Sequence, residues 1–317
     1  MKNIAVIYGG YSSEYQISMQ SGKYVASIID KDKFNVFEIL MLQEKWTCEN
    51  HDGEIDKSDF SIVTKDKKIK IDKALILIHG TPGENGILQA YLEMQNIPYV
   101  GSDVLASSLT FNKFYCNTYL RNYQTLIAKS VIIRQGDEIN TNKIIEKLSL
   151  PIFVKPNAGG SSFGISKVKK EEELLKAINH AFTESDEVII EEFIKGREIT
   201  CGLAKIDGKI QTFPLCEIIS KNEFFDYQAK YNSDLNQEIV PAPISETLSD
   251  ECKQISVEIY KNLNCSGIVR IDYILSNNKF YFLEVNTIPG MTAESLVPKM
   301  IKHAKINITD LYTKLLK

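Results

Sequence analysis

The chain has 317 residues, of which 44% are hydrophobic and 25% are charged, and its formal net charge is −4. This composition is typical of a globular protein, and so small a net charge gives no reason to expect a nucleic-acid partner. The opening run, MKNIAVIYGG, is too short and lacks the cleavage site of a signal peptide, and no run approaches the roughly 20 apolar residues of a membrane span, so we expect no membrane partner.

The length of the chain predicts its number of lobes, and the spacing of its cysteines bears on metal binding. A single hydrophobic core stops growing at about 250 to 300 residues, so a chain of this length predicts two or three lobes. The cysteines show neither a C-x-x-C pair nor a histidine at zinc-ligand spacing, which argues against zinc. Reduced thiols are the usual state in the cytoplasm, and we expect a cytoplasmic protein.

The first segment predicts the start of an open α/β sheet. A buried-strand run, 4–8, is followed by two glycines and Glu14, then by a helix, then by a strand at 34–42. We expect the helix to bury Ile17, Val25, Ile28 and Ile29. Ligands of such sheets lie beyond the carboxyl ends of the strands. The G-x-G-x-x-G fingerprint is absent, so a dehydrogenase has little support.

A second buried run, 74–78, ends in the loop HGTPGENG, and we expect a helix at 87–95. Both glycine-bearing loops follow strands directly, so they should open on the same edge of a parallel sheet. Glu14, beside two glycines, is well placed to meet an ammonium group, whereas Glu84 is expected to serve its own loop. A plain loop charge is the alternative for either residue.

Between residues 101 and 123 the pattern is helical and carries Lys113. Lys155 then ends a predicted strand, and the loop NAGGSSFG follows at once. Such a loop can turn its backbone N–H groups onto phosphate oxygens while the lysine supplies charge. It is not a Walker A loop, because the lysine precedes the glycines. A flexible hairpin tip is an equally good reading of this segment alone.

A helix at 170–182 should bury Leu174, Leu175, Ile178 and Phe182, and it leads to the strand that carries Glu191 to Ile194. A turn at 195–196 returns the chain through Glu198. This edge can pair with adenine while a carboxylate takes ribose hydroxyls, although for the segment taken alone a plain hairpin is the better reading. Residues 220–238 lack a clean period, and an irregular stretch of this length suggests a functional lid. Helices are expected at 248–263 and from about 306.

The most informative stretch is 270–296, where two β-rich runs flank Asn277 and Asn278 and predict a tight hairpin. Because residues two apart share a strand face, the hairpin gathers one cation and three oxygen ligands: Arg270, Asp272, Glu284 and Asn286. Carboxylate and amide oxygens suit Mg²⁺. A solvated hairpin with a cross-strand salt bridge is the alternative. A turn through Gly290 then runs into a helix N-terminus at Ser295 and Leu296, where free N–H groups can hold an anion.

Seven segments, in this order and at these separations, resemble the D-alanine:D-alanine ligases of the ATP-grasp superfamily: GGYSSE, HGTPGENG, KPNAGGSSFG, EEFIKGRE, FFDYQAKY, GIVRIDY and LEVNTIPGMTAESLVP. The match covers essentially the whole chain, and its variable stretches are 44–70 and 135–149. Phe225 and Gln228 stand where Tyr and Glu are expected. Lys230 and Tyr231 are in place.

The resemblance implies a mixed α/β, three-lobed ATP-grasp architecture. Its parts would be an N-terminal open parallel α/β sheet domain at 1–100, a central lobe with the phosphate loop at 101–190, and a C-terminal lobe with lid and hairpin at 191–317. It also implies an ATP-binding set: Lys113, Lys155, Ser162, Glu191, Ile194, Glu198 and Lys230. Two Mg²⁺ ions, with Mn²⁺ as a substitute, would bind to Asp272, Glu284 and Asn286.

For the substrates, the resemblance implies that Glu14 meets the ammonium of the first D-alanine and that Ser161 and Tyr231 link it to the lid, with His79 nearby. Arg270 and the Gly290 backbone would face the reacting carboxyl oxygens. Ser295 and Leu296 would take the second carboxylate.

The implied activity is ATP-dependent joining of two D-alanine molecules through an acyl phosphate, for peptidoglycan precursors. A homodimer is usual in the family. D-Lactate or D-serine as second substrate is the alternative within the fold, which Tyr231 disfavours because depsipeptide-forming members tend to differ there. A non-catalytic nucleotide-binding regulator is the alternative outside it, and the retained metal ligands and Arg270 disfavour it.

Overall fold

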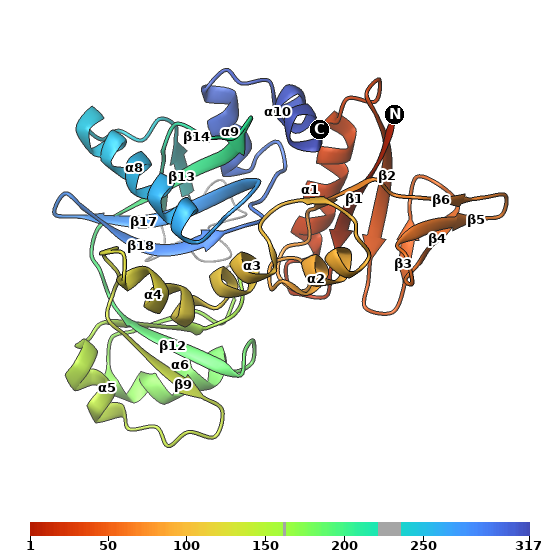
Figure 1. Cartoon of the computed structure of the whole chain (residues 1–317). Helices are drawn as coiled ribbons and strands as arrows, with labels where there is room; N and C mark the ends of the chain where they lie inside the picture. The colour runs from red at the N-terminus through yellow and green to blue at the C-terminus, as the bar shows by residue number, and fades with distance from the viewer. Residues whose placement is uncertain (161–162, 221–235) are drawn as a thin grey trace.

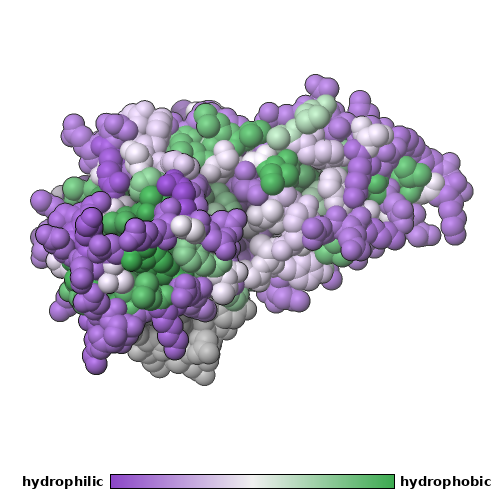
Figure 2. All heavy atoms as spheres, turned by 90° about the horizontal axis from the view of Figure 1, so that it is seen from below, coloured by the Kyte–Doolittle hydropathy of each residue, from purple (hydrophilic) through white to green (hydrophobic). Residues whose placement is uncertain are grey.

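A computed structural model describes residues 1–160, 163–220 and 236–317. Within these ranges the chain forms a mixed α/β structure with three sheets, each flanked by helices (Figure 1). Of the helices in this part of the chain, none combines the length and apolarity needed to cross a bilayer. The face seen in Figure 2 is mainly hydrophilic, with hydrophobic atoms in small patches.

The first sheet has eight strands in the order β6-β5-β4-β3-β2-β1-β7-β8. Its strands are β1 (Lys2–Gly9), β2 (Phe34–Met41), β3 (Trp46–Cys48), β4 (Gly53–Asp56), β5 (Ser61–Thr64), β6 (Lys68–Ile69), β7 (Lys73–Ile76) and β8 (Tyr99–Val100). β2, β1, β7 and β8 are parallel, which confirms the predicted open sheet. β3 to β6 extend it through antiparallel pairs and lie in a stretch for which no strand was predicted.

Helix α1 (Tyr15–Ile28) follows β1 as predicted, and the predicted buried face is half right, since Val25 and Ile29 are buried. Ile17 and Ile28 are only partly buried. The buried face within the helix is formed by Ser18, Ser21, Gly22, Val25 and Ala26. The reason is close approach: a Cβ on Gly22 would lie 2.2 Å from the Tyr8 ring, so small residues are needed where the helix meets β1.

The second sheet is antiparallel, in the order β11-β10-β12-β9. Its strands are β9 (Ser130–Arg134), β10 (Ile152–Pro156), β11 (Ser166–Val168) and β12 (Glu187–Glu192), and its helices are α5 (Thr141–Leu148) and α6 (Leu174–Ala181), with a 3₁₀ turn at Glu171–Glu173. Leu174 and Ile178 are buried on α6 as predicted. Leu175 is exposed instead, because Ala177 and Ala181 complete the inner face.

β12 and β13 do not form the plain hairpin that was one reading of 187–200. β12 pairs with β9 and β10, whereas β13 (Arg197–Ile206) pairs with β14, β15 and β17 in the third sheet. Residues 193–196 therefore carry the chain from one sheet to the next.

The third sheet runs β16-β15-β13-β17-β18, with β14 paired to β13. Its other strands are β14 (Lys209–Thr212), β15 (Cys216–Ser220), β16 (Asn236–Ile239), β17 (Ile268–Ser276) and β18 (Lys279–Asn286). The predicted hairpin is confirmed: β17 and β18 pair around Asn277 and Asn278, both of which have positive φ. The predicted irregular stretch 220–238 is too long, since 236–238 belong to β16.

The remaining helices link the lobes. They are α2 (Ile87–Met94), α3 (Val104–Phe111), α4 (Lys113–Arg121), α8 (Glu246–Asn262), α9 (Leu296–His303) and α10 (Ile308–Leu316). Asn112 breaks the predicted 101–123 helix in two, because it leaves the helical region and its side chain caps α4. α10 ends beside β1 (Figure 1), where the Lys2 ammonium donates to the Lys317 carbonyl at 2.7 Å. One core cluster includes Ile4 and Val25 together with Phe213 and Leu311, so the first and third sheets share a core.

Candidate active site

Lys113, the first residue of α4, joins the glycine-serine loop to the C-terminal hairpin. Its ammonium donates to the Gly159 carbonyl at 2.7 Å and lies 3.4 Å from a carboxylate oxygen of Glu284 on β18. The side chain is nearly buried. Three segments that are far apart in sequence thus meet at one cation.

Lys155 lies at the end of β10, as predicted, and is nearly buried. Its ammonium pairs with the Glu191 carboxylate at 2.6 Å. Glu191 is also buried and accepts a hydrogen bond from the Asn117 amide at 3.0 Å. The pair results from sheet register, because β10 and β12 are antiparallel neighbours. Two residues of the predicted ATP-binding set are therefore in contact.

Arg270 and Asp272 form a buried, bidentate ion pair on β17. The guanidinium Nε and Nη2 donate to Asp272 at 2.9 and 2.8 Å. Thr200 on β13 donates to the same carboxylate at 2.5 Å, and the Asn286 amide donates to it at 3.1 Å. Burial alone would lower the pKa of Arg270, but the Asp272 carboxylate raises it, so the guanidinium stays charged.

The three predicted metal ligands lie together. Asp272 is directly opposite Glu284 in the β17–β18 ladder, and Asn286 touches Asp272. Across the described ranges, no three His, Cys, Asp or Glu side chains gather at metal-binding distance. Two carboxylates and an amide fit Mg²⁺ better than a soft metal, because Mg²⁺ keeps water and takes substrate phosphate for the rest of its shell.

The two glycine-bearing loops of the first sheet meet at its carboxyl edge, which confirms that prediction. The Tyr11 N–H donates to the Thr81 carbonyl at 3.2 Å, and the Ser12 hydroxyl donates to the His79 carbonyl at 2.8 Å. Glu14 is buried here. A Cβ added to Gly160 would lie 2.4 Å from the Glu14 carboxylate, so the glycine-serine loop reaches this edge too.

Glu84 serves its own loop, as predicted, since the Gly80 N–H donates to its carboxylate at 2.7 Å. Burial and the nearby Glu14 carboxylate raise the pKa of Glu84 to about 8. His79 is buried as well, and burial lowers its pKa, so the imidazole is neutral at pH 7. The His79 Nε2 lies 3.2 Å from the Ser21 hydroxyl on α1.

The turn after β18 leads into α9 as predicted, with Ser295 at the N-cap and Leu296 as its first residue. The Ser295 hydroxyl accepts from the Thr292 N–H at 3.1 Å rather than capping the helix. A Cβ on Gly290 would lie 3.1 Å from the Ser295 hydroxyl, so the backbone at Gly290 packs closely on the start of α9.

Ile194 and Glu198 flank the crossing between the second and third sheets. Ile194 is half-buried in the connection, and Glu198 lies on β13 two residues before Thr200. The Glu198 carboxylate is close enough to Arg270 to raise its pKa further. The remaining predicted site residues lie outside the described residues: Ser161, Ser162, Lys230 and Tyr231, together with Phe225 and Gln228.

Sequence reasoning missed several polar residues that hold this constellation together. Thr200 could have been found from the period of two, since it shares a strand face with Glu198. Asn157 directly follows Lys155 and Pro156; its side chain accepts from the Phe114 N–H at 2.8 Å and donates to Glu187 at 2.7 Å. Asn117 and Ser21 carry no local signal, because their partners are distant in sequence.

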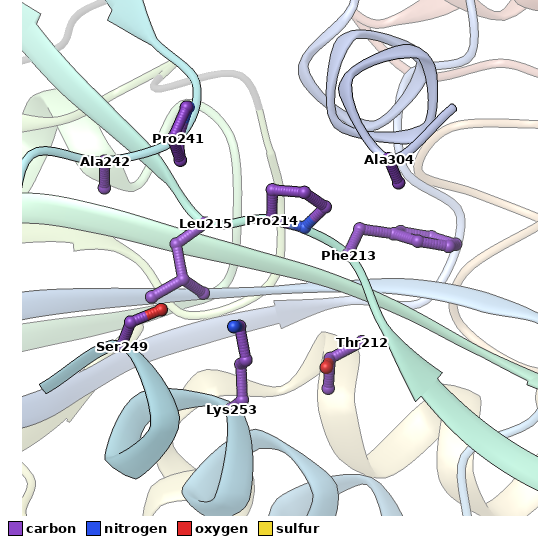
Figure 3. Close-up of a pocket in the computed structure, with 9 residues that line it drawn as sticks. All are labelled: Thr212, Phe213, Pro214, Leu215, Pro241, Ala242, Ser249, Lys253 and Ala304. Atoms are coloured by element: carbon purple, nitrogen blue, oxygen red, sulfur yellow. The ribbon is translucent and has the colours of Figure 1, made fainter. Parts of the chain in front are cut away.

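A cavity of about 310 Å³ lies in the C-terminal part of the chain (Figure 3). Its walls come from the connection between β14 and β15, from the start of α8 and from the end of α9. The Lys253 side chain points into it. None of its lining residues belongs to the predicted site, so it is a separate feature.

Comparison with known proteins gives consistent matches along the chain. The model of the D-ala D-ala ligase N-terminus matches residues 3–102, and that of the D-ala D-ala ligase C-terminus matches 120–317. The chain is 48% identical to a D-alanine–D-alanine ligase of Azobacteroides pseudotrichonymphae, over 100% of this chain and 99% of the relative.

Two solved structures are similar in fold as well. The VanG D-Ala:D-Ser ligase from Enterococcus faecalis is 34% identical with a TM-score of 0.88, and the match covers 99% of this chain and 98% of the other. A D-alanine–D-alanine ligase from Bacillus anthracis complexed with ATP is 32% identical with a TM-score of 0.81, and the match covers 100% of this chain and 96% of the other.

Proposed function

This chain belongs to the D-alanine–D-alanine ligase family, and from that premise we propose how its own residues carry out the reaction. The enzyme is an ATP-dependent ligase of ATP-grasp fold that joins two D-alanine molecules for peptidoglycan precursor synthesis. The assignments of individual residues below are our proposal.

ATP lies where α4, the glycine-serine loop and the hairpin meet. Lys113 and Lys155 contact its phosphates, and the loop that contains Ser162 covers them. Both lysines are held in place by carboxylates, Glu284 and Glu191. Adenine and ribose lie along the connection between the second and third sheets, against Glu191, the Ile194 backbone and Glu198. Lys230, from the lid, also contacts ATP.

Asp272, Glu284 and Asn286 would hold the metal, as two Mg²⁺ ions or two Mn²⁺ ions in their place. The bound ions would screen the charge between ATP and the substrate carboxylate. Asp272 is fixed in orientation by Thr200 and Arg270, and Asn286 also donates to it, so a bound ion would replace at least one of these donors.

The reaction proceeds in two steps. The carboxylate of the first D-alanine attacks the γ-phosphorus, the bond to the β–γ bridging oxygen breaks, and ADP leaves an acyl phosphate behind. The amine of the second D-alanine then attacks the carbonyl carbon, phosphate departs, and the amine loses a proton. Negative charge builds on the carbonyl oxygen, and Arg270 and the Gly290 N–H are the donors that meet it.

The substrates lie at the edge where both glycine-bearing loops and the glycine-serine loop meet. Glu14 accepts hydrogen bonds from the first D-alanine's ammonium, and Ser161 and Tyr231 connect it to the lid. His79 is neutral and lies beside this position. Ser295 and Leu296, at the start of α9, receive the carboxylate of the second D-alanine.

The observation that carries this proposal is the position of Lys113, between the Gly159 carbonyl and the Glu284 carboxylate. It supports a single phosphate site shared by the loop and the hairpin. The test is phosphate release from ATP with D-alanine, L-alanine, D-serine or D-lactate, each added singly or beside D-alanine. We expect strong release with D-alanine alone and formation of D-alanyl-D-alanine. Equal release with L-alanine would contradict it.

Three wider assignments belong to the same proposal. The lobes are 1–100, 101–190 and 191–317, except that Glu191 and Glu192 go with the central lobe, because β12 (Glu187–Glu192) pairs with β9 and β10. The protein acts in the cytoplasm, where ATP is supplied, and it forms a homodimer. The exposed apolar side chains Ile87 and Met94 on α2 and Leu105 on α3 support an interface there, because the two helices are neighbours. Light scattering of wild type and Leu105→Glu tests this, with a dimer and a monomer expected.

A further inference from the structure

Helix α1 carries two buried serines, one turn apart, that make different connections. Ser18 accepts from the Gly9 N–H at 2.8 Å and donates to the Leu77 carbonyl at 2.8 Å, so both its partners lie in the first sheet or directly beside it. Ser21 instead accepts from the Met291 N–H at 3.1 Å. Met291 belongs to the turn that follows β18, some 270 residues further along the chain.

The Ser21 hydroxyl has a second partner, the His79 Nε2 at 3.2 Å. His79 is neutral, because burial lowers its pKa. A neutral imidazole that offers its Nε2 lone pair to the Ser21 O–H carries its own proton on Nδ1. The oxygen of Ser21 is then free to accept the Met291 N–H. With this placement of the protons, the Ser21 hydroxyl donates to the His79 Nε2 and accepts from the Met291 N–H, so it links the histidine to the turn.

The position of Ser21 depends on the close approach of α1 to β1. Gly22 permits this approach, since any side chain there would overlap the Tyr8 ring. Ser21 and Ser18 are fully buried on that face. The hydroxyl therefore projects from a rigid surface toward the backbone of the residue that follows Gly290.

From these contacts we propose that Ser21 is a positioning residue: it fixes the Gly290–Met291 turn, and with it the backbone N–H aimed at the reacting carbonyl oxygen, relative to His79 and the first D-alanine. The inference rests on the proposed role of Gly290. Geometry of this kind matters because a donor displaced by about 1 Å can lose about 100-fold in rate.

Ser21→Ala, with Ser18→Ala as its matched control, tests the proposal. Each variant removes two buried hydrogen bonds from the same helix face, so the two should lose similar thermal stability. Ser21→Ala should also lower kcat about 10- to 100-fold with an unchanged KM for ATP, whereas Ser18→Ala should keep kcat within about 3-fold of wild type. Equal kcat values for the two variants would overturn the proposal.

Two further variants keep the test decisive. Ser21→Cys preserves volume but weakens both hydrogen bonds, so it should fold even if Ser21→Ala does not, and its kcat should still fall by several-fold; a wild-type kcat would overturn the proposal. Arg270→Ala in the same assay separates the two claims. If Arg270→Ala is inactive while the serine variants match each other, only the role of Ser21 fails. If Arg270→Ala is fully active, the proposed chemistry fails first.

Discussion

Replacing Arg270 by alanine separates the structural role of this residue from its chemical one. The guanidinium makes a bidentate contact with Asp272, and the two side chains are 16% and 7% exposed. Breaking a buried ion pair from one side costs about 3 to 5 kcal/mol, because a charge is left without its partner. Thr200 and Asn286 still donate to Asp272, which favours the low end, about 3 kcal/mol.

For a chain of this size, about 3 kcal/mol corresponds to a fall in Tm of about 6 to 12 °C. The chemical effect is separate. Loss of one donor to the developing oxyanion costs about 100- to 1,000-fold in kcat, and the KM for ATP should change little, because Arg270 is not assigned to the nucleotide. Scanning fluorimetry and a coupled assay for ADP release measure the two quantities on the same samples.

Arg197→Ala is the matched control. Arg197 forms a bidentate pair with the buried Glu217 in the same sheet, at 2.6 and 2.8 Å; its own side chain is more exposed than that of Arg270, and it has no assigned role in the chemistry. We expect it to lower Tm while kcat stays within about 10-fold of wild type. If Arg270→Ala lost no more kcat than Arg197→Ala, the reasoning about the oxyanion would be refuted.

Four further predictions follow from the same structure. Glu284→Gln should abolish Mg²⁺-dependent turnover and leave the circular dichroism spectrum unchanged; near-normal ATP consumption would remove Glu284 from the metal site. Gly160→Ala should raise the KM for the first D-alanine at least about 10-fold, since the added methyl meets the Glu14 carboxylate; an unchanged KM would show that the loop does not press on Glu14. The pKa of Glu84 is raised from 4.5 to about 8, so the native state loses stability relative to the unfolded chain as pH rises between these values. Glu84→Gln removes this pH-dependent loss. The unfolding free energy of the variant, measured in urea, should exceed that of wild type by a margin that grows by about 1 kcal/mol or more between about pH 5 and about pH 8. A difference that does not change with pH would contradict the raised pKa of Glu84. All six cysteines are buried and burial raises the pKa of each thiol, so alkylation of the native enzyme should be far slower than in urea; rapid native labelling would contradict it.

The hairpin and the glycine-bearing loops could be predicted because their signals are local. Asn277 and Asn278 adopt the positive φ that a tight turn requires, and the period of two placed Asp272 beside Arg270. The open sheet followed from buried runs that end in glycines. These features depend on a few neighbouring residues, so one sequence suffices to find them.

Other features depend on contacts between distant segments and left no local signal. The buried face of α1 is built from serine and glycine, because the helix lies so close to Tyr8, and hydrophobic periodicity does not detect such a face. β3 to β6 are short and half exposed, so their apolar pattern is weak. The pairing of Lys155 with Glu191 depends on the register of β10 and β12.

The most direct measurement is a crystal structure with a non-hydrolysable ATP analogue and Mg²⁺. Our account predicts the triphosphate beside Lys113 and Lys155, with the metal on Asp272, Glu284 and Asn286 and the glycine-serine loop over the same phosphates. An analogue bound away from the β17–β18 hairpin, with the loop and the metal ligands contacting different molecules, would contradict it.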